Sequence, residues 1–456
     1  MNQKFDVVVV GAGAAGSTAA ISAARRGART LLVDRLPFLG GTSTAVLDTF
    51  YAFYTPGETV RRVVGGLGWE VVEHLRAAGM AFERPNTYGA GTGVTYDPEV
   101  LKVTWERLAE ESGVEILLHT WATGVQMHDG RMSAIRLWNK GGESLVEGGA
   151  IVDASGDADL CAMAGVPYDD ARSTPNLQSM STIFRIANVD VDRAASLPKA
   201  ELWALMREAA GSGSYRLPRL EGSWHRTPYA GVVTVHMTRI PNVDATDPQQ
   251  LTRAELEGRR QVQEYHRFLR NLVPGFEHSV LVATSSAIGV RESRRVMGDY
   301  RLSRDDVLGA HRFADEIALC GAPIEDHVPG TDTRWTYVPQ SGVYGIPYRC
   351  LLPVGIEAML VAGRCFSASH DAHASARSMA TCMAMGQAAG TAAALAFGSG
   401  TTPRAIDPRA LREGLAGDGA LLDPIAPAVA RVAELVRKAR LLGRRPESAI
   451  PAVLHR

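Results

Sequence analysis

Cysteine is scarce and scattered in this chain. Its five cysteines, Cys161, Cys320, Cys350, Cys365 and Cys382, form no C-x-x-C pair and no spacing typical of a metal site. We therefore expect neither disulfide-reductase chemistry nor a bound metal. An odd number of cysteines also argues against a disulfide framework, so we expect a reducing, cytoplasmic location.

Long apolar runs and an excess of charge are missing too. No stretch approaches the roughly 18 consecutive apolar residues of a membrane span, and the four valines at 7–10 are too few for a signal-peptide core. The formal net charge of −1 predicts no binding to nucleic acid or to an anionic membrane surface. With 46% apolar residues among 456, the chain has the composition of a globular protein of about two or three compact units.

The clearest pattern lies in the first 34 residues. Residues 7–10 have the β-branched composition of a strand buried on both faces. Gly11-Ala-Gly13-Ala-Ala-Gly16 follows, then a helical stretch at 17–26 and a second strand at 30–33 that ends in Asp34. This order predicts a dinucleotide-binding unit, whereas a glycine-rich turn in another kind of α/β protein would leave Asp34 unexplained.

Each part of this pattern has a physical task. Gly11 permits the tight turn, Gly13 lets the backbone approach a pyrophosphate, and Gly16 lets the helix pack against the strand. The start of the helix offers free N–H groups and partial positive charge to phosphates. Asp34 would accept hydrogen bonds from ribose hydroxyls and would repel a 2′-phosphate. Further contacts with the cofactor are predicted for Ala14, Ala15 and Arg35.

Strand-like stretches follow at 114–119, 124–127, 133–138 and 150–153, with Asp129-Gly130 as a hairpin turn. This succession resembles the FAD domain of glutathione-reductase type, in which a three-stranded excursion interrupts the Rossmann sheet. The predicted fold is therefore α/β, a Rossmann-like FAD-binding domain with an inserted α+β substrate or cap domain. The resemblance implies further FAD contacts at Gly40, Gly41, Thr42, Ser43, Thr123, Gly124, Ala154, Ser155, Gly156 and Asp157.

The C-terminal third carries a second resemblance. Residues 344–353, 363–370 and 375–390, together with 288–300, are similar to the FAD-dependent oxidoreductase family related to fumarate reductase flavoproteins and thiazole-forming enzymes. The similarity runs from Val7 to Leu395. Ala380 departs from it, because a proline is expected there, and its loss leaves the helix start less sharply defined. The family implies FAD contacts at Gly363, Arg364, Thr381, Cys382 and Met383.

The helix expected at 381–397 contains no charged residue and should be buried. Its small residues Gly386, Ala389 and Gly390 would allow close packing against the first Rossmann helix. Its N-terminal N–H groups either point at the N1/O2 edge of the flavin or belong to a plain core helix. Arg364 either neutralises the pyrophosphate or forms a surface ion pair.

The sequence suggests three parts. FAD-domain pieces cover 1–45, 97–168 and 345–410, the substrate or cap domain covers 46–96 and 169–344, and a helical tail covers 411–456. In the cap we expect strands at 181–189 and 230–237 and helices at 251–272 and 303–319. The tail contains a probable helix at 428–442, and its basic character fits either an anionic partner or packing on this or a neighbouring subunit.

Catalytic candidates are polar residues expected beside the flavin, because the cofactor performs the bond chemistry and the protein adds a base or an anion clamp. His370 or His373 would remove a proton as hydride leaves, and Arg377 would bind a substrate carboxylate or the flavin. Tyr344 would donate to a substrate oxygen, unless it is an ordinary buried tyrosine. Arg291 and Arg349 are candidates for substrate binding, with internal ion pairing as the alternative, and His225, His236 and His327 are treated as background.

The predicted function is an FAD-dependent dehydrogenase or oxidase that transfers hydride between a small polar substrate and flavin N5. A flavin monooxygenase or halogenase is the enzymatic alternative, but Gly363-Arg364 and Trp335-Thr-Tyr-Val-Pro339 do not match their Gly-Asp and Trp-x-Trp-x-Ile-Pro motifs. A non-catalytic electron-transfer flavoprotein is the other alternative, against which the large cap argues. The sequence leaves open the substrate, the electron acceptor, the oligomeric state and covalent attachment of FAD through His370, His373 or Cys365.

Overall fold

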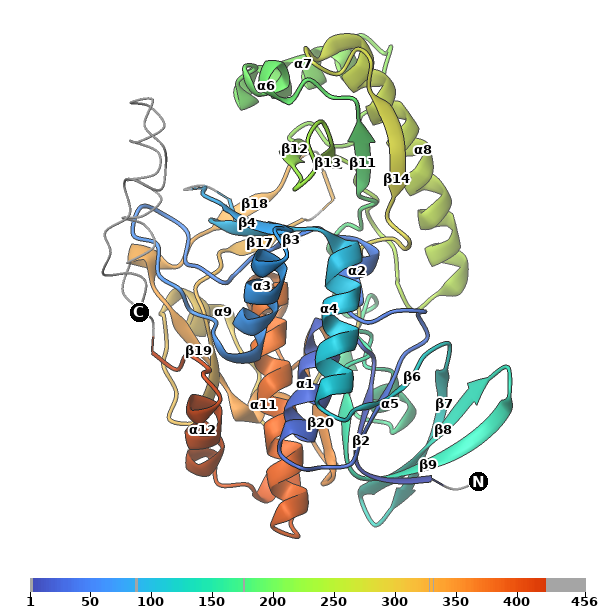
Figure 1. Cartoon of the computed structure of the whole chain (residues 1–456), viewed down its shortest axis with the longest axis vertical. Helices are drawn as coiled ribbons and strands as arrows, with labels where there is room; N and C mark the ends of the chain where they lie inside the picture. The colour runs from blue at the N-terminus through green and yellow to red at the C-terminus, as the bar shows by residue number, and fades with distance from the viewer. Residues whose placement is uncertain (1–2, 87–88, 175–176, 328, 331, 424–456) are drawn as a thin grey trace.

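The computed structural model describes residues 3–86, 89–174, 177–327, 329–330 and 332–423. The helix predicted at 428–442 lies outside these residues. The chain forms a body around one large sheet, and a cap lies at one end of the body (Figure 1).

The body is organised by a seven-stranded sheet in the order β6-β2-β1-β9-β8-β7, with β20 also paired to β9. The strands β1, β2, β6 and β20 run parallel to the end of β9, whereas β7, β8 and the start of β9 form an antiparallel meander. This arrangement confirms the predicted Rossmann-like sheet and its three-stranded excursion. The strands are β1 (Gln3–Val10), β2 (Thr30–Val33), β6 (Glu115–Leu117), β7 (Trp121–His128), β8 (Arg131–Asn139), β9 (Gly142–Asp153) and β20 (Met359–Val361).

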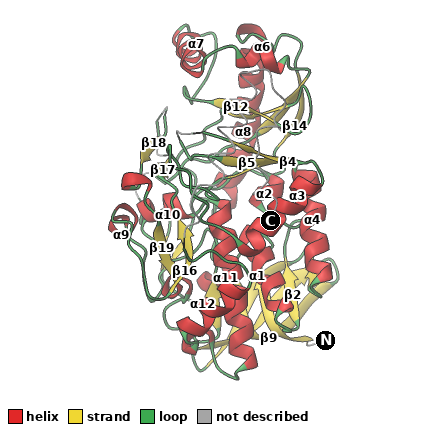
Figure 2. Ribbon diagram, turned by 60° about the vertical axis from the view of Figure 1, so that its left-hand side comes forward, coloured by secondary structure: helices red, strands yellow, loops and turns green. Residues whose placement is uncertain are grey.

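Two helices pack side by side in the middle of the body, α1 (Ala14–Arg25) and α11 (Met379–Gly398) (Figures 1 and 2). Their backbones approach closely because α11 has glycine where α1 presents its carbonyls. A Cβ atom on Gly386 would lie 2.0 Å from the Ala15 oxygen, and one on Gly390 would lie 2.0 Å from the Ala19 oxygen. The predicted packing of these two helices is confirmed. Although α11 is long and apolar enough to cross a membrane, it is mostly buried inside the body, as a core helix is.

The start of α11 lies two residues earlier than expected, at Met379. The unexpected Ala380 has a local role there, since its N–H donates a hydrogen bond of 3.3 Å to the carbonyl of Tyr51. A proline has no N–H and could not make this bond. The residue that departs from the family pattern therefore ties the first turn of α11 to the segment after β3.

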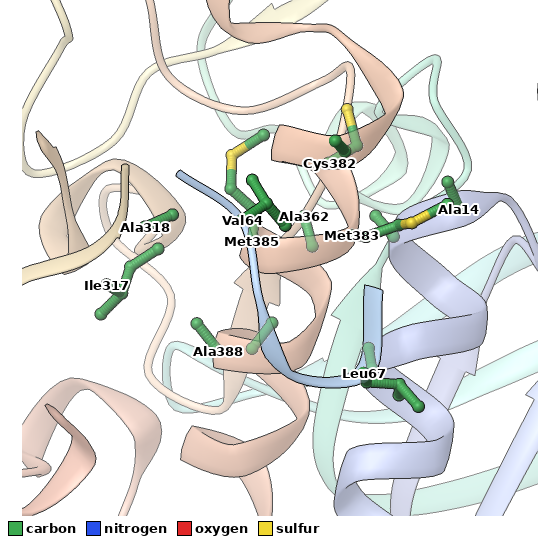
Figure 3. Packing of buried hydrophobic residues seen from close by; sticks show 14 of the residues in the cluster. Ala14, Val64, Leu67, Ile317, Ala318, Ala362, Cys382, Met383, Met385 and Ala388 are labelled. Carbon is green, nitrogen blue, oxygen red and sulfur yellow. The ribbon is translucent and has the colours of Figure 1, made fainter. Parts of the chain in front are cut away.

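Shorter elements cover the body. Figure 3 shows Met383 of α11 pointing toward Ala14, with Ile317 and Ala318 of β16 on the other side of α11. The remaining elements of the body are α2 (Thr42–Ala45), β3 (Thr49–Phe50), α3 (Gly66–Ala77), β4 (Ala81–Arg84), β5 (Gly93–Tyr96), α4 (Pro98–Glu111), α5 (Asp159–Met163), β10 (Tyr168–Asp169), β15 (Arg295–Val296), α9 (Arg304–Leu308), β16 (Glu316–Cys320), β17 (Ile324–Asp326), β18 (Arg334–Thr336), η1 (Pro339–Ser341), β19 (Tyr344–Pro347), η2 (Tyr348–Leu351), α10 (His370–Ala376), η3 (Pro403–Ala405) and α12 (Pro408–Gly417).

The cap has a hydrophobic core of its own. Its four strands form an antiparallel sheet in the order β12-β13-β11-β14, and the buried face of α8 contributes residues at helical spacing such as Val262, Tyr265 and Phe268. The elements of the cap are β11 (Phe184–Ala187), α6 (Val191–Ala195), α7 (Lys199–Gly211), β12 (Ser223–Arg226), β13 (Val233–His236), α8 (Pro248–Leu272) and β14 (Val280–Thr284).

The hydrophobic clusters divide the chain differently from the predicted domains. The main cap cluster draws its buried residues from 184–276, whereas buried residues from 50–114 and 302–352 share a cluster with α1 and α11. Most of the segments predicted as cap at 46–96 and 296–344 thus pack on the body, because α3 and β16 both lie against α11. The helix predicted at 303–319 is wrong. It ends at Leu308 before Ala310, which has a φ of 49°, and Glu316–Cys320 forms a buried strand.

Candidate active site

The carboxylate of Asp34 lies at the end of β2, against the glycine-rich loop. It accepts hydrogen bonds from the backbone N–H of Ala12 and, at 2.7 Å, from that of Leu36. Burial raises the pKa of Asp34, and these backbone hydrogen bonds oppose the rise. The structure thus places the acid predicted to bind ribose next to the loop predicted to bind phosphate.

The three glycines of the loop differ in what a side chain would meet. A Cβ on Gly11 would lie 2.3 Å from the Ala154 oxygen, and one on Gly16 would lie 1.7 Å from the Gly11 oxygen. A Cβ on Gly13 would meet nothing within 4 Å. Packing inside the protein therefore accounts for Gly11 and Gly16, whereas the open space at Gly13, in front of the start of α1, fits the pyrophosphate of a dinucleotide.

The second glycine pair lies directly against this loop. The N–H of Gly40 donates to the Ala12 carbonyl at 2.7 Å, and a Cβ on Gly41 would lie 2.8 Å from the Gly13 Cα. Gly40 and Gly41 have φ values of 98° and 54°, which glycine adopts readily. Thr42 and Ser43 begin α2 at this point, so all four predicted contact residues at 40–43 come together with the first loop.

Asp157 lies just beyond β9, the strand that ends beside β1, and it decides between the two roles considered for Arg364. The Arg364 guanidinium forms an ion pair with Asp157 at 2.8 Å and donates to Ser293 Oγ at 2.6 Å. Burial works against ionisation of Asp157, but Arg364 and Ser293 outweigh it and lower its pKa. Arg364 is therefore held in an internal ion pair. Gly363 brings its loop against α1, since a Cβ there would lie 2.8 Å from that of Ala15.

Some predicted contacts lie apart from this group. Thr123 and Gly124 lie within β7, where the Thr123 hydroxyl donates to the Arg136 carbonyl. The residue of this segment that contacts Asp34 is Thr120, whose N–H donates to the Asp34 carbonyl. Arg35 follows Asp34 along the chain, and its positive charge favours the ionised forms of both Asp34 and Asp157, although burial still raises the pKa of Asp34.

At the start of α11 the side chains predicted to contact FAD are engaged with protein groups. Thr381 Oγ1 contacts the Cys320 sulfur, Cys382 contacts the Arg377 carbonyl, and the Met383 carbonyl accepts from Thr18. Among the backbone N–H groups of this turn, those of Ala380 and Cys382 donate to the Tyr51 and Ser378 carbonyls.

Two candidates for chemistry are placed elsewhere. The hydroxyl of Tyr344 is buried and lies 2.6 Å from Ser375 Oγ, and burial raises its pKa well above its usual value. Arg349 forms an ion pair with Asp315 at 2.9 Å and lies over the ring of Tyr300. These contacts match the alternatives considered for both residues, an ordinary buried tyrosine and internal ion pairing, and neither residue lines the cavity described below.

The two predicted catalytic histidines lie on α10 in opposite electrostatic states. Burial alone would lower the pKa of His370, but hydrogen bonds with Asp326 at 3.3 Å and Glu292 at 2.9 Å raise it to about 9. Burial lowers the pKa of His373 to about 3, and its Nε2 lies 2.8 Å from the Arg364 carbonyl. Neither imidazole therefore has the pKa near neutral pH that suits a general base.

A cavity of about 450 Å³ lies between the cap and the body. Figure 2 shows β4, β5, β17 and β18 between the body helices and the cap, and the cavity is lined by residues of β4, β17, β18, α7, β12 and β13. Three histidines treated as background in the sequence, His225, His236 and His327, line it. Two of them lie on neighbouring strands, β12 and β13, with ring centroids 4.9 Å apart. The sequence pattern did not reveal that these two strands pair, and it is this pairing that brings the two rings together.

Comparison with known proteins identifies the family. A family model described as FAD dependent oxidoreductase matches residues 6–415. The chain belongs to this family. FAD is the cofactor of this FAD-dependent oxidoreductase, in agreement with the space at Gly13 and the position of Asp34.

The matched relatives are distant or cover little of the chain. Over 41 residues, 9% of the chain and 7% of the relative, the oxidoreductase is 56% identical to a 3-oxosteroid 1-dehydrogenase from Mycobacterium tuberculosis. Over 214 residues it is 22% identical to digeranylgeranylglycerophospholipid reductase 1 from Methanococcoides burtonii, covering 43% of the chain and 48% of the relative. The oxidoreductase thus spans less than half the length of these relatives. Among solved structures it is similar to the flavin-dependent brominase Bmp2, at 13% identity and a TM-score of 0.48 over 97% of this chain and 88% of the other.

Beside the cavity, the oxidoreductase holds two arginines close to one carboxylate. Arg291 donates to the Ser179 carbonyl at 2.6 Å, and Arg377 donates to Gln178 Oε1 at 2.9 Å. Burial lowers the pKa of Arg291 to about 9, with the positive charge of Arg377 adding to this effect. Glu325 lines the cavity as Arg291 does, and although burial opposes its ionisation, His327, Arg377 and Arg291 hold its pKa far below the usual value. Arg291 lines the cavity, as a substrate-binding residue must, while Arg377 lies behind the wall.

Proposed function

We propose that this FAD-dependent oxidoreductase is a dehydrogenase or oxidase that transfers hydride between flavin N5 and a small polar substrate bound in the 450 Å³ cavity. One observation carries the proposal. Tyr51 lines the cavity, and its carbonyl accepts the N–H of Ala380 in the first turn of α11. The cavity thus adjoins the helix end to which the family resemblance assigns the flavin.

FAD supplies the acceptor or donor of hydride, so the protein must bind and orient the substrate and handle a proton. We propose His236 for the proton, in place of His370 and His373. It lines the cavity, and its Nε2 has no hydrogen-bond partner and lies 3.7 Å from the buried carboxylate of Asp48. A carboxylate beside an imidazole orients the ring for proton transfer. Asp48 itself lies three residues before Tyr51 in the chain.

The experiment is a reductive half-reaction. Purified holoenzyme is mixed without oxygen with hydroxy acids, amines and sugars, and absorbance of the flavin is followed. We expect one class to bleach the flavin, and His236→Gln to slow the bleaching about 10²- to 10⁴-fold, the usual effect of removing a general base, at unchanged FAD content. His128→Gln, on the exposed hairpin between β7 and β8, is the control and should bleach at the normal rate.

Two outcomes contradict the proposal. Bleaching by a nicotinamide alone, with the organic substrate consumed only when oxygen is admitted, would indicate a monooxygenase or halogenase. Normal bleaching by His236→Gln would remove this histidine from the chemistry. We also propose a cytoplasmic location, which is supported by the five buried, unpaired cysteines.

A further inference from the structure

The cavity carries more positive than negative charge. Its basic side chains are Arg84, Lys199, Arg219 and Arg291, and its carboxylates are Glu221 and Glu325. Burial lowers the pKa of His225 and His327 well below 6.5, so these two rings are neutral and do not change the balance. A cavity of this composition attracts anions.

Three of the arginines are held by neutral groups. Arg84 donates to the Tyr51 hydroxyl at 2.7 Å, Arg291 donates to Ser179 and Ser181, and Arg219 donates to the His236 carbonyl at 3.3 Å. Among the residues that the structure describes, none of the three lies within 4.0 Å of a carboxylate oxygen. These hydrogen bonds position the guanidinium groups without forming an ion pair.

Unpaired polar atoms point to a missing partner. The Nε atoms of Arg219 and Arg377 are buried and make no hydrogen bond. Glu325 is the carboxylate that acts most strongly on the charges of Arg219, Arg291 and Arg377. Its Oε1, however, already lies 2.8 Å from Nε2 of His327. Glu221 and Asp332 also carry negative charge near Arg219, and Glu292 does so near Arg377, so the guanidinium groups are only partly compensated. Burying charge without a partner is costly, so a ligand that brings negative charge would be stabilised here.

Part of the lining is apolar. Pro85, Leu197, Leu202, Trp203 and Trp224 face the same cavity. The two indoles are held in place, since Trp203 Nε1 donates to the Gly222 carbonyl at 2.9 Å and Trp224 packs edge-on against Phe276. Apolar walls with a few fixed polar groups are typical of sites for small organic molecules, and the volume is in their usual range.

We propose that the cavity binds an organic carboxylate, with the anion held by Arg84, Arg219 and Arg291 and an apolar or aromatic body placed against Trp203 and Trp224. This inference rests on the proposed function, because it names the substrate class of the same cavity. Arginine suits the task, since its planar fork binds a carboxylate through two hydrogen bonds.

Equilibrium binding to the oxidised holoenzyme tests the proposal without turnover. Isothermal titration calorimetry would compare benzoate, phenylacetate and cyclohexanecarboxylate with their uncharged amides and with acetate. We expect at least one of the three acids to bind about tenfold or more tightly than its amide, the effect of a charge-assisted hydrogen bond, and more tightly than acetate. If no substrate bleached the flavin in the reductive half-reaction while the acids still bound, the proposed reaction would be rejected and the anion site would stand.

Variants locate the binding. Arg219→Gln and, separately, Arg84→Gln should weaken binding of the acid about tenfold and leave binding of the amide unchanged. Arg260→Gln, on the exposed face of α8, is the control and should bind the acid normally. FAD content and the unfolding temperature report whether each variant is folded. The proposal is overturned if acids bind no better than amides, if acetate binds as tightly as the larger acids, or if both folded arginine variants keep full affinity.

Discussion

Gly13 is the residue whose missing side chain is explained by a ligand rather than by the protein. Its neighbours in the motif have backbone atoms within 2.3 Å of where a Cβ would lie, while the space at Gly13 is open. Its φ of −65° and ψ of −175° are also accessible to alanine. The three glycines, alike in the sequence, thus separate into two packing positions and one binding position.

A pair of alanine substitutions tests this distinction. Gly13→Ala should leave the thermal stability of the FAD-free protein unchanged or raised by up to about 1 kcal/mol, because the backbone tolerates alanine there. The same change should lower FAD affinity about tenfold or more, because the methyl group occupies the space for pyrophosphate. Gly16→Ala should prevent stable folding. FAD per chain and thermal unfolding are the measurements, and a Gly13→Ala protein with normal FAD affinity would contradict the assignment.

Single residues of the site were predicted with uneven success. Asp34 and the glycines follow from local sequence, because the strand, turn and helix that present them are consecutive. The protonation states of His370 and His373 do not, since they depend on Glu292, which is 78 residues away from His370. His225 and His236 were missed because the sequence pattern did not reveal that β12 pairs with β13, the next strand along the chain, which brings their rings together.

At the scale of elements, the close contact of α1 and α11 joins the two ends of the cofactor domain. Thr18 Oγ1 donates to the Met383 carbonyl at 3.0 Å, and this bond requires the backbones to be near each other. Gly386 and Gly390 make that distance accessible. The position of α11, and with it the wall of the cavity at Tyr51, therefore depends on two missing side chains.

Adding one methyl group to α11 tests this packing. Gly386→Ala would place a Cβ 2.0 Å from the Ala15 oxygen, so the helices must separate. We expect a loss of about 1–3 kcal/mol or more in the free energy of unfolding, as found when a packed core is overfilled. Gly398→Ala, at the last residue of the same helix, would meet nothing within 4 Å and is the control. It should be neutral or stabilising by up to about 1 kcal/mol, and chemical denaturation that showed equal effects would argue against the close contact.

Elements with strong local signals were predicted well, and the error at 303–319 shows the limit. The expected helix continues a capping box at Ser303 and Asp306 that does begin a helix. Beyond Gly309 the chain turns and forms β16, because Glu316–Cys320 pairs with β19 against α11. A buried strand and a buried helix turn share the same apolar composition, so only the partner strand distinguishes them.

For the whole molecule, the cap is tied to the body where the chain leads into it and out of it. Ser181 and Gly289 form a bridge, and Arg291 binds Ser179 and Ser181. Glu292 accepts the N–H of Gln178 and pairs with His370, which in turn contacts Asp326 on β17. This buried network connects the cap strands, α10 and the wall of the cavity, so its charge state affects the molecule as a whole.

The pH dependence of unfolding tests the network. The pKa of His370 is raised from 6.5 to about 9, so its stabilisation is complete below pH 6.5 and is lost as the pH rises through about 9. Burial opposes ionisation of Glu292, yet His370 and its neighbours lower its pKa from 4.5 to about 2, so on the acid side stability falls between these values. The difference in unfolding free energy between the native chain and His370→Gln should reach up to about 3 kcal/mol at pH 5–6.5 and shrink toward pH 10.

The exposed His278→Gln variant controls for the loss of any histidine. It should follow the native chain across the same range of pH in denaturant titrations. If the difference in unfolding free energy between His370→Gln and the native chain stayed constant from pH 6 to pH 10, the two carboxylates would not be keeping this histidine protonated. The electrostatic role would then be refuted.

The sequence alone determined the cofactor and the layout of its domain, because a dinucleotide is bound by consecutive strand, loop and helix, and local patterns record such units. Only the tertiary structure decided where the cap begins, which histidines face the cavity and which arginines lack a carboxylate. Those properties arise from contacts between residues tens to hundreds of positions apart, and burial there sets both the partners and the charge of each group.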